Sequence, residues 1–494
     1  MTTSSVPFRS PFIWFNSNRR KAIVFYLFPI LLVFAAICFA AIVLALNSSP
    51  SLVGGGLTKI AETGIFISSL IVMAYFLVYT GRHIIFSAVA LRSYRRALEE
   101  NGLEDRNDYP KVSVIIAAHN EGVVIEDAVK TMAGQDYPNF EVVVIDDGST
   151  DDTPMILQRL AHEIPILRYV RRENGGFGKP DALNYGLKYV SGDIVLTFDA
   201  DYVPMSPDVL KRLSRWFSRD PSCWAVQGFL VPYNTGNGSV IAKSVFCERV
   251  GGYIVNQLAR QQLGLLPQYG GTVGGFRREV IQRLGWNGNA LTEDTDLTVR
   301  IAINGGKVIY DVTARSWEQA VQNLRSYWRQ RYRWARGHMQ CALRYFADIM
   351  RSKTMGFAQK LDAVLLLGIY FVGVMTALGW LLSFAWWAYG LSWSSIFSAA
   401  YFPILAFWTF GALGNTAPFH ELIVGLKLYG NGVMKMSKYV LLLAPLFLLN
   451  TAICCEALVH ELVGHRSRWE KTERYLGVLH NNGNSHNSRN QGHT

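Results

Sequence analysis

Two aspartates, Asp199 and Asp201, follow the apolar run 194–198 directly and are separated by a single residue. The run is bounded by Gly192 and Pro204, and its length and composition predict a strand buried on both faces. Side chains two residues apart on an extended chain point to the same side, so these carboxylates could bind one hard cation. Such a cation takes further ligands from water and phosphates. An Asp-x-Asp pair alone is a weak signal, because acids at strand ends are often only solvated.

Earlier segments place more acids at the ends of predicted strands. The β-branched runs 111–117 and 140–145 end in acidic turns and precede helical segments, as central strands of a parallel sheet do. Open α/β sheets bind ligands beyond the carboxyl ends of their strands, so the acids should meet at one edge. Such an edge would suit a ribose, a base edge and a metal-bound diphosphate, with Lys179 as a compensating cation. The acids are Glu121, Asp146, Asp147, Asp199 and Asp201.

Two common nucleotide-binding motifs do not fit this region. The turn after the first predicted strand reads Ala-Ala-His-Asn-Glu-Gly and lacks the GxGxxG pattern of a dinucleotide site. Gly178-Lys179 has neither the spacing of a Walker P-loop nor the Ser or Thr that follows its lysine. The sequence therefore argues against a Rossmann dinucleotide site and against a P-loop NTPase.

Three further motifs lie in the second half of the polar region. Residues 270–275 form a predicted glycine-rich loop, and the motif 292–294 reads Thr-Glu-Asp and precedes a segment of helical periodicity. Polar and acidic residues at that place are typical of a helix N-terminus. The motif 330–334 reads Gln-Arg-Tyr-Arg-Trp and belongs to segment 324–346, where aromatic residues alternate with arginines. This segment predicts an amphipathic helix on a membrane surface, whose Arg and Trp could also contact a diphosphate and a sugar ring.

Long apolar segments flank the polar region on both sides. With 50% hydrophobic residues and a mean hydropathy of +0.15, the chain is more apolar than a purely soluble enzyme. A helix of about 20 apolar residues is long enough to span a bilayer. We therefore expect an integral membrane protein with one large inserted domain. The five apolar segments are 22–47, 64–91, 361–389, 396–419 and 439–458.

The net charge of +11 is distributed as in a membrane protein, and we expect no nucleic-acid partner. Basic residues precede the first apolar segment and follow the second, as the positive-inside rule requires of cytoplasmic flanks. This pattern predicts a multi-pass protein of the plasma (inner) membrane with a cytoplasmic central domain. A cleaved signal peptide fits poorly because a second apolar segment follows the first. The six cysteines lack zinc-ligand spacing and are expected to be free thiols.

In order and spacing these motifs resemble the membrane-embedded family 2 glycosyltransferases, which include cellulose, hyaluronan and poly-N-acetylglucosamine synthases. The resemblance covers residues 110–340 and the flanking apolar segments, and it implies an α/β GT-A-like fold. This fold is a mixed, mainly parallel sheet with helices on both faces, inserted here between transmembrane and interfacial α-helices. The chain departs from the family at Ala117-Ala118-His119, where many relatives have Pro-x-Tyr or Pro-x-Phe, and in the Val-Gly-Gly of the glycine-rich loop. The matching motifs are Asn120-Glu121, Asp146 to Ser149, Lys179 with Ala182-Leu183-Asn184, Asp199 to Asp201, Thr292 to Asp294 and Gln330 to Trp334.

The resemblance also implies a role for each matching residue. The catalytic motif would be Thr292, Glu293 and Asp294, with Asp294 as the general base. The nucleotide-sugar would be bound by Glu121, Asp147, Lys179, Asp199, Gln330 and Arg333. The acceptor would contact Trp334, Gly274 and Gly275, and Asp201 with Asp199 would bind Mg²⁺ or Mn²⁺.

An enzyme with these parts would be an inverting hexosyltransferase that uses UDP-glucose or UDP-N-acetylglucosamine. The Gln-x-x-Arg-Trp motif favours a processive synthase of a β-linked polysaccharide, and the membrane helices could export the growing glycan. One alternative is a single-addition enzyme that makes a membrane glycolipid. Another is a catalytically inactive membrane scaffold or transporter, which would require a missing acid, and every acid of the motifs is present.

The predicted organisation has five parts. They are a flexible basic leader at 1–21, two transmembrane helices in 22–91, a cytosolic GT-A domain at 110–345 that ends in the interface helix, transmembrane and interface helices at 355–464, and a mostly disordered cytosolic tail at 465–494. Five spans that begin in the cytoplasm would leave this tail outside, although its basic residues favour the inside. We therefore expect one apolar stretch between 361 and 419 to be interfacial or re-entrant.

Overall fold

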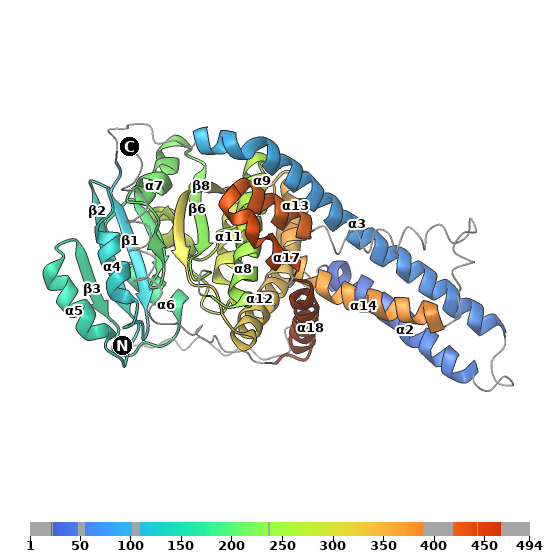
Figure 1. The fold of residues 1–494 in the computed structure, drawn as a ribbon. Coiled ribbons are helices and arrows are strands. Elements are labelled where there is room, and N and C mark those ends of the chain that lie inside the picture. Colours follow the sequence, from blue (N-terminus) through green and yellow to red (C-terminus); the bar gives the residue numbers. More distant parts are fainter. Residues whose placement is uncertain are drawn as a thin grey trace. The chain divides into compact units, whose positions relative to one another are not determined.

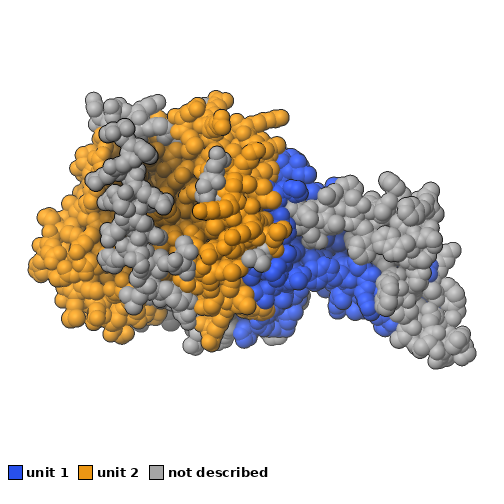
Figure 2. Space-filling model, in the orientation of Figure 1, with its two compact units in different colours: residues 1–86, 331–421, 444–468 blue, residues 87–330, 422–443, 469–494 orange. Residues whose placement is uncertain are grey.

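The computed structural model describes residues 21, 23–47, 55–100, 109–235, 238–388, 418–441 and 443–465. They fall into two compact units (Figure 2): unit 1 is drawn from residues 1–86, 331–421 and 444–468, and unit 2 from 87–330, 422–443 and 469–494. The predicted leader, except for Lys21, and nearly all of the predicted tail lie outside the described residues. The same holds for most of the apolar segment 396–419.

Unit 2 is built on an eight-stranded mixed sheet in the order β3-β2-β1-β4-β7-β6-β8-β5 (Figure 1). Strands β3, β2, β1 and β4 pair in parallel, as do β6 and β8, whereas β7 is antiparallel to both β4 and β6. The predicted mixed, mainly parallel sheet is therefore confirmed. The strands are β1 (Val112–Ala118), β2 (Phe140–Asp146), β3 (Leu167–Arg171), β4 (Ile194–Asp199), β5 (Val203–Pro204), β6 (Cys223–Pro232), β7 (Gly274–Arg277) and β8 (Lys307–Glu318).

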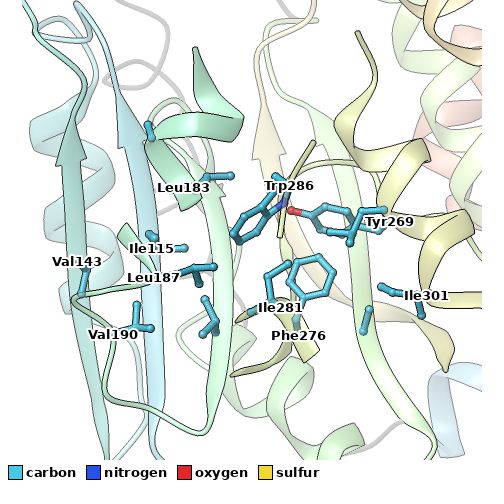
Figure 3. Packing of buried hydrophobic residues seen from close by; sticks show 14 of the residues in the cluster. Ile115, Val143, Leu183, Leu187, Val190, Tyr269, Phe276, Ile281, Trp286 and Ile301 are labelled. Atoms are coloured by element: carbon cyan, nitrogen blue, oxygen red, sulfur yellow. The ribbon is translucent and has the colours of Figure 1, made fainter. Parts of the chain in front are cut away.

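Helices connect the strands and cover the sheet (Figure 1). Leu183 of α6 (Lys179–Gly186), Ile281 of α10 (Arg278–Leu284) and Ile301 of α11 (Glu293–Ile303) belong to one buried core with Phe276 and Trp286 (Figure 3). Burying a side chain of this size stabilises the fold by roughly 1.5–3 kcal/mol. The helical elements are α4 (Ile125–Ala133), α5 (Thr153–Glu163), α6 (Lys179–Gly186), α7 (Val209–Arg219), α8 (Val240–Gly251), η3 (Gly252–Gln257), α9 (Leu258–Gln262), α10 (Arg278–Leu284), α11 (Glu293–Ile303), η4 (Asn431–Ser437) and α17 (Lys438–Leu441).

The predicted glycine-rich loop is wrong in its second half, because Gly274 and Gly275 open strand β7 and are buried. A Cβ on Gly274 would lie 2.4 Å from the carbonyl oxygen of Val226, and one on Gly275 would lie 2.4 Å from Leu196 Cδ2. Only glycine therefore lets β7 pack this closely between β4 and β6. The structure gives these glycines a packing role, and their contact with an acceptor stays a prediction.

Gly275→Ala should lower the thermal unfolding temperature of the protein, because its Cβ would also lie 2.5 Å from the carbonyl oxygen of Val195. We expect a loss of about 1–3 kcal/mol, the usual cost of overpacking a core. The control is Gly252→Ala, since a Cβ there has no atom within 4 Å and alanine suits the helical backbone. Unfolding followed by circular dichroism would measure both, and equal midpoints would contradict the packing argument.

Unit 1 contains the apolar helices. Three helices of the described chain contain windows that are long and apolar enough to span a membrane, at Phe25–Ile42, Ile60–Glu99 and Leu443–Leu462. Helices α13 and α14 are bent by 59° at Gly368, and they would add a fourth if they form one span. The helical elements are η2 (Ile23–Leu27), α2 (Phe28–Asn47), α3 (Gly55–Glu100), α12 (Leu324–Arg351), α13 (Phe357–Leu367), α14 (Ile369–Ala388) and α18 (Leu443–Leu462), of which α3 and α12 continue into unit 2.

Tyrosine hydroxyl groups donate hydrogen bonds to backbone carbonyl oxygens near the break between α13 and α14. Tyr26 donates a hydrogen bond to the carbonyl oxygen of Val364 at 2.9 Å, and Tyr79 donates to that of Leu365 at 3.0 Å. The last carbonyl groups of a helix have no partner within the helix and are costly to bury unsatisfied. The carbonyl oxygen of Val364 already accepts from Gly368 N and receives a second hydrogen bond from Tyr26, whereas Tyr79 supplies a partner for the carbonyl group of Leu365.

Candidate active site

The strand register brings the predicted acidic turns to one edge of the sheet. Ala118 at the end of β1 pairs with Asp146 at the end of β2, and Ala117 pairs with Asp199 at the end of β4. Strand β7 is antiparallel to β4 and begins opposite Thr197, so the loop before β7 lies beside the residues that follow β4. Motifs that are far apart in the sequence therefore meet beyond the carboxyl ends of β1, β2 and β4.

Asn120 ties the first acidic turn to the second. Its backbone has a φ of 54°, a left-handed conformation that asparagine adopts more readily than most residues. The side-chain oxygen of Asn120 accepts a hydrogen bond from Thr150 N at 2.7 Å, and the backbone N–H of Asn120 donates to Ser149 Oγ at 2.9 Å. Glu121 follows, and its N–H donates to Thr153 Oγ1 at 2.8 Å. Glu121 is thereby fixed, nearly buried, against the turn that carries the aspartates of β2.

The two neighbouring aspartates of that turn have different surroundings. The fully buried Asp146 accepts hydrogen bonds from Ser149 N at 2.8 Å, from the Tyr169 hydroxyl at 3.1 Å and from Arg171 Nη1 at 3.1 Å. These three bonds hold the turn together, because a buried carboxylate needs such partners. The family motif does not distinguish Asp146 from Asp147 in this way, and the structure assigns Asp146 to the scaffold.

Asp147 lies beside residues 174–178, a second glycine-rich segment, which leads to Lys179. Its Oδ1 lies 2.9 Å from Arg172 Nη1, and its Oδ2 accepts a hydrogen bond from Gly178 N at 3.3 Å. A Cβ on Gly175 would lie 2.4 Å from the carbonyl carbon of Asp147, so the segment approaches the aspartate as only glycine permits. Arg172, which directly follows β3, was not among the predicted site residues.

Lys179, the first residue of α6, joins three parts of the candidate site. Its Nζ lies 2.5 Å from Asp199 Oδ1 and 3.9 Å from Glu293 Oε1. It also donates a hydrogen bond to the carbonyl oxygen of Gly271 at 2.8 Å. Burial alone would lower the pKa of Lys179, but the carboxylates of Asp199, Glu293 and Asp294 raise it above its ordinary value. The lysine is therefore a persistent cation among the predicted donor-binding and catalytic acids.

The motif 292–294, for which a catalytic role is predicted, lies at the N-terminus of α11, as its sequence indicated. Thr292 precedes the helix, and Glu293 and Asp294 are in its first turn, where the helix dipole favours carboxylates. Asp294 Oδ1 accepts a hydrogen bond from Thr295 N at 2.7 Å. A Cβ on Gly271 would lie 3.5 Å from Asp294 Oδ2 and 3.7 Å from Lys179 Nζ, so these two side chains flank the same glycine.

Asp201 lies between β4 and β5 and is only 4% exposed. Burial raises the pKa of the adjacent Tyr202, and the carboxylates of Glu318, Asp201 and Asp199 raise it further. The Tyr202 hydroxyl donates a hydrogen bond to Glu318 Oε2 at 2.9 Å. Of the three carboxylates that act on Tyr202, Asp199 is paired with Lys179 and Glu318 with Arg249.

The described residues contain no cluster of three or more His, Cys, Asp or Glu side chains arranged to hold a metal ion. Asp199 and Asp201 supply two carboxylates, and Asp199 is paired with Lys179. A hard cation could bind there if phosphate oxygens or water supplied the remaining ligands, as is usual for Mg²⁺. The donor set fits a metal that arrives with a diphosphate, and it does not resemble an all-protein cage.

Gln330, Arg333 and Trp334 lie on the continuous helix α12. Gln330 is the last residue of its stretch of unit 2, whereas Arg333 and Trp334 belong to unit 1. The predicted helix is confirmed, and Arg331 places its guanidinium 4.4 Å from the centre of the Trp334 ring. The roles of these three residues at the diphosphate and the acceptor stay predictions.

Comparison with known proteins gives the site a chemical context. Residues 113–285 match the family model described as Glycosyl transferase family 2, which includes β1, β2, β4 and Lys179. A probable glycosyltransferase, YdaM of Bacillus subtilis, is 29% identical over 75% of this chain and 89% of its own length. A beta-monoglucosyldiacylglycerol synthase of Synechocystis is 35% identical over 51% of this chain, and a poly-beta-1,6-N-acetyl-D-glucosamine synthase of Staphylococcus aureus is 26% identical over 53%.

The latter two matches cover part of each relative. They span 53% of the Synechocystis protein and 63% of the Staphylococcus aureus protein. One of these relatives is named for a glycolipid product and the other for a polysaccharide product. The comparisons therefore support sugar transfer and a GT-A-like fold, and leave the acceptor open.

Proposed function

We propose that this glycosyltransferase, whose residues 113–285 form a family 2 domain, moves a hexose from a UDP-sugar to an acceptor hydroxyl with inversion. One observation carries the proposal. Lys179 Nζ contacts Asp199, the carbonyl oxygen of Gly271 and the edge of the Glu293 carboxylate, and Asp294 flanks the same glycine. A cation for the diphosphate and a candidate base thus lie at one place in unit 2.

In the proposed reaction, Asp294 accepts the proton of the acceptor hydroxyl. The hydroxyl oxygen then forms a bond to the anomeric carbon, and the bond from that carbon to the donor oxygen breaks. UDP leaves with the electron pair, and an α-linked donor gives a β-linked product. A single base is sufficient because UDP leaves as an anion and needs no proton, whereas hydrolysis of a glycoside needs an acid to protonate the departing alcohol as well as a base or nucleophile on the other side of the bond.

Asp199 and Asp201 would hold a divalent cation, Mg²⁺ or Mn²⁺, on the donor diphosphate. When bound, such an ion stabilises the negative charge of the departing UDP. The residues of the chain would do the remaining work: Asp147 and Glu121 bind the uridine, and Lys179 binds the diphosphate. For the last role, Lys179 would exchange its bond to Asp199 for bonds to phosphate oxygens.

Replacing Lys179 by Met should raise the KM for the UDP-sugar by about 10–100-fold, the range expected when one charge-assisted hydrogen bond is lost. The control is Lys188→Met, because Lys188 is exposed and lies in the turn directly after the same helix. Initial rates at varied donor concentration would measure both variants. An unchanged KM for Lys179→Met would contradict contact between this lysine and the diphosphate.

The proposed product is a β-linked polysaccharide. The Gln330-Arg333-Trp334 motif supports this proposal, because family members that add one sugar often lack it. Similarity to the poly-N-acetylglucosamine synthase supports it as well. The helices of unit 1 would then place the enzyme in the plasma membrane, with its catalytic unit in the cytoplasm, and would provide a path for the glycan across the membrane.

Transfer of one sugar to a membrane lipid is the second candidate. It is supported by the 35% identity to a beta-monoglucosyldiacylglycerol synthase, a higher identity than to the polysaccharide synthase. Both candidates use the same donor site and the same base, and they differ only in the acceptor.

Product analysis would separate the two candidates. Membranes that contain the protein would be incubated with a panel of radiolabelled UDP-sugars and then extracted with organic solvent. A polysaccharide synthase should leave label in a large product that does not enter the organic phase and that a linkage-specific β-glycosidase degrades. Label confined to a lipid that carries one sugar would exclude the polysaccharide, and transfer from no UDP-sugar would contradict the proposed function itself.

A further inference from the structure

The side-chain amide of Gln227, in the middle of β6, clamps the backbone of residues 270–273. Its Oε1 accepts a hydrogen bond from Gly270 N at 2.6 Å. Its Nε2 donates to the carbonyl oxygens of Thr272 at 3.1 Å and Val273 at 3.4 Å. Gln227 has no solvent exposure, so its amide bonds both ends of this segment from inside the protein.

The clamped segment has a conformation that its sequence alone would disfavour. Val273 has a φ of 51°, and a β-branched residue rarely adopts a positive φ because its side chain crowds the backbone. Such a residue persists only where the surrounding structure holds it in place. A hydrogen bond from Gly228 N to the carbonyl oxygen of Val273 at 2.8 Å assists the Gln227 amide. Without the amide, we expect the segment to relax.

Residues 270–273 contact Lys179, Asp199 and Asp294, which have proposed roles in the reaction. The carbonyl oxygen of Gly271 accepts the hydrogen bond from Lys179, and Thr272 Oγ1 accepts one from Asp199 N at 2.9 Å. Gly271 also lies against Asp294, because a Cβ on this glycine would be within van der Waals distance of Oδ2. A shift of residues 270–273 would therefore move Lys179, the end of β4 and the surroundings of Asp294 together.

We propose that Gln227 is a positioning residue for sugar transfer, which acts through residues 270–273 and not by contact with the substrate. This role rests on the proposed function, because the segment matters for transfer only if Lys179, Asp199 and Asp294 take part in it. No motif in the sequence marks Gln227 as functional, and its full burial is seen only in the structure. The inference comes from the contacts of its amide with a strained backbone.

The test compares Gln227→Met with Gln135→Met in the full-length protein. Gln135 is also a nearly buried glutamine, and its Nε2 donates to the carbonyl oxygen of Ser206 at 3.2 Å. Both variants should lose stability, which thermal unfolding would record. Only Gln227→Met should lower kcat/KM, by about tenfold or more, and it should speed hydrogen exchange of the peptide that contains 270–273. Equal activity of the two variants would overturn the positioning role.

A double-mutant cycle provides a readout that general destabilisation would not change. Thr272→Val removes the hydroxyl that accepts from Asp199 N while keeping the shape of the side chain. If Gln227 acts through Thr272, the double variant should lose no more than about twofold beyond Gln227→Met alone. Losses that multiply would overturn the part of the proposal in which Gln227 acts through Thr272 and Asp199 N. A wild-type protein that transfers no sugar would instead overturn the proposed function, whatever the exchange data show.

Discussion

Replacing Asp294 by Asn should abolish sugar transfer while leaving the affinity for the UDP-sugar nearly unchanged. The asparagine keeps the size of the side chain and can still accept the hydrogen bond from Thr295 N. It cannot take a proton from the acceptor hydroxyl, and a positioned general base contributes about 10²–10⁴-fold to the rate of such a step. Turnover would be measured with a radiolabelled donor, and binding by calorimetry with UDP or the UDP-sugar.

The control for this variant is Asp193→Asn. Asp193 precedes β4, at the end of the strand opposite to Asp199, and its side chain is 69% exposed. The Asp193→Asn substitution removes one negative charge from the same unit without changing a residue of the site, so the turnover of this variant should match that of the wild type. Wild-type turnover by Asp294→Asn would refute the assignment of the base. Loss of donor binding together with turnover would indicate that Asp294 binds the donor instead.

Removing the divalent metal, or Asp201, should abolish transfer as well. Metal stabilisation of a departing diphosphate is worth several kcal/mol, so we expect EDTA and Asp201→Ala each to lower the rate by about 10²-fold or more. Adding Mg²⁺ or Mn²⁺ in excess of EDTA should restore the wild-type rate. It should restore little activity to Asp201→Ala, because the variant lacks one of the two carboxylates at the end of β4.

Two controls make the metal experiment decisive. Glu173→Gln removes a carboxylate whose side chain is 82% exposed, and its activity should respond to EDTA as that of the wild type does. Asp201→Asn should behave like Asp201→Ala if the charge is what matters, since Asp201 is buried and asparagine preserves its volume. Transfer that continues in EDTA, or full activity of both Asp201 variants, would show that the reaction does not need this metal.

Much of unit 2 could be predicted from the sequence because its signals are local. The β-branched runs 111–117 and 140–145 became β1 and β2, and the acidic turns lie at their carboxyl ends as the alternation of strands and helices required. The motif 292–294 was placed correctly at a helix N-terminus. The spacing of these motifs also carried the family resemblance, and residues 113–285 match the model of Glycosyl transferase family 2.

Residues 270–275, the predicted glycine-rich loop, show what local sequence signals cannot predict. Its composition suggested one loop, yet residues 270–273 contact Lys179 and Asp199, whereas Gly274 and Gly275 are buried in β7. A run of glycines has the same composition in either setting. Which glycines form a strand depends on pairing with β4 and β6, whose residues are far away in the sequence.

The sequence by itself determined the kinds of groups in this protein: apolar helices, a parallel βαβ core and acids at strand ends, since periodicity and composition are properties of short segments. Only the tertiary structure decided which groups meet. It buried Asp146 as a scaffold residue, surrounded Lys179 with the carboxylates of Asp199 and Glu293, and placed Gln227 behind a strained backbone. These outcomes depend on strand register and long-range packing, in which a shift of one residue turns every side chain to the opposite face.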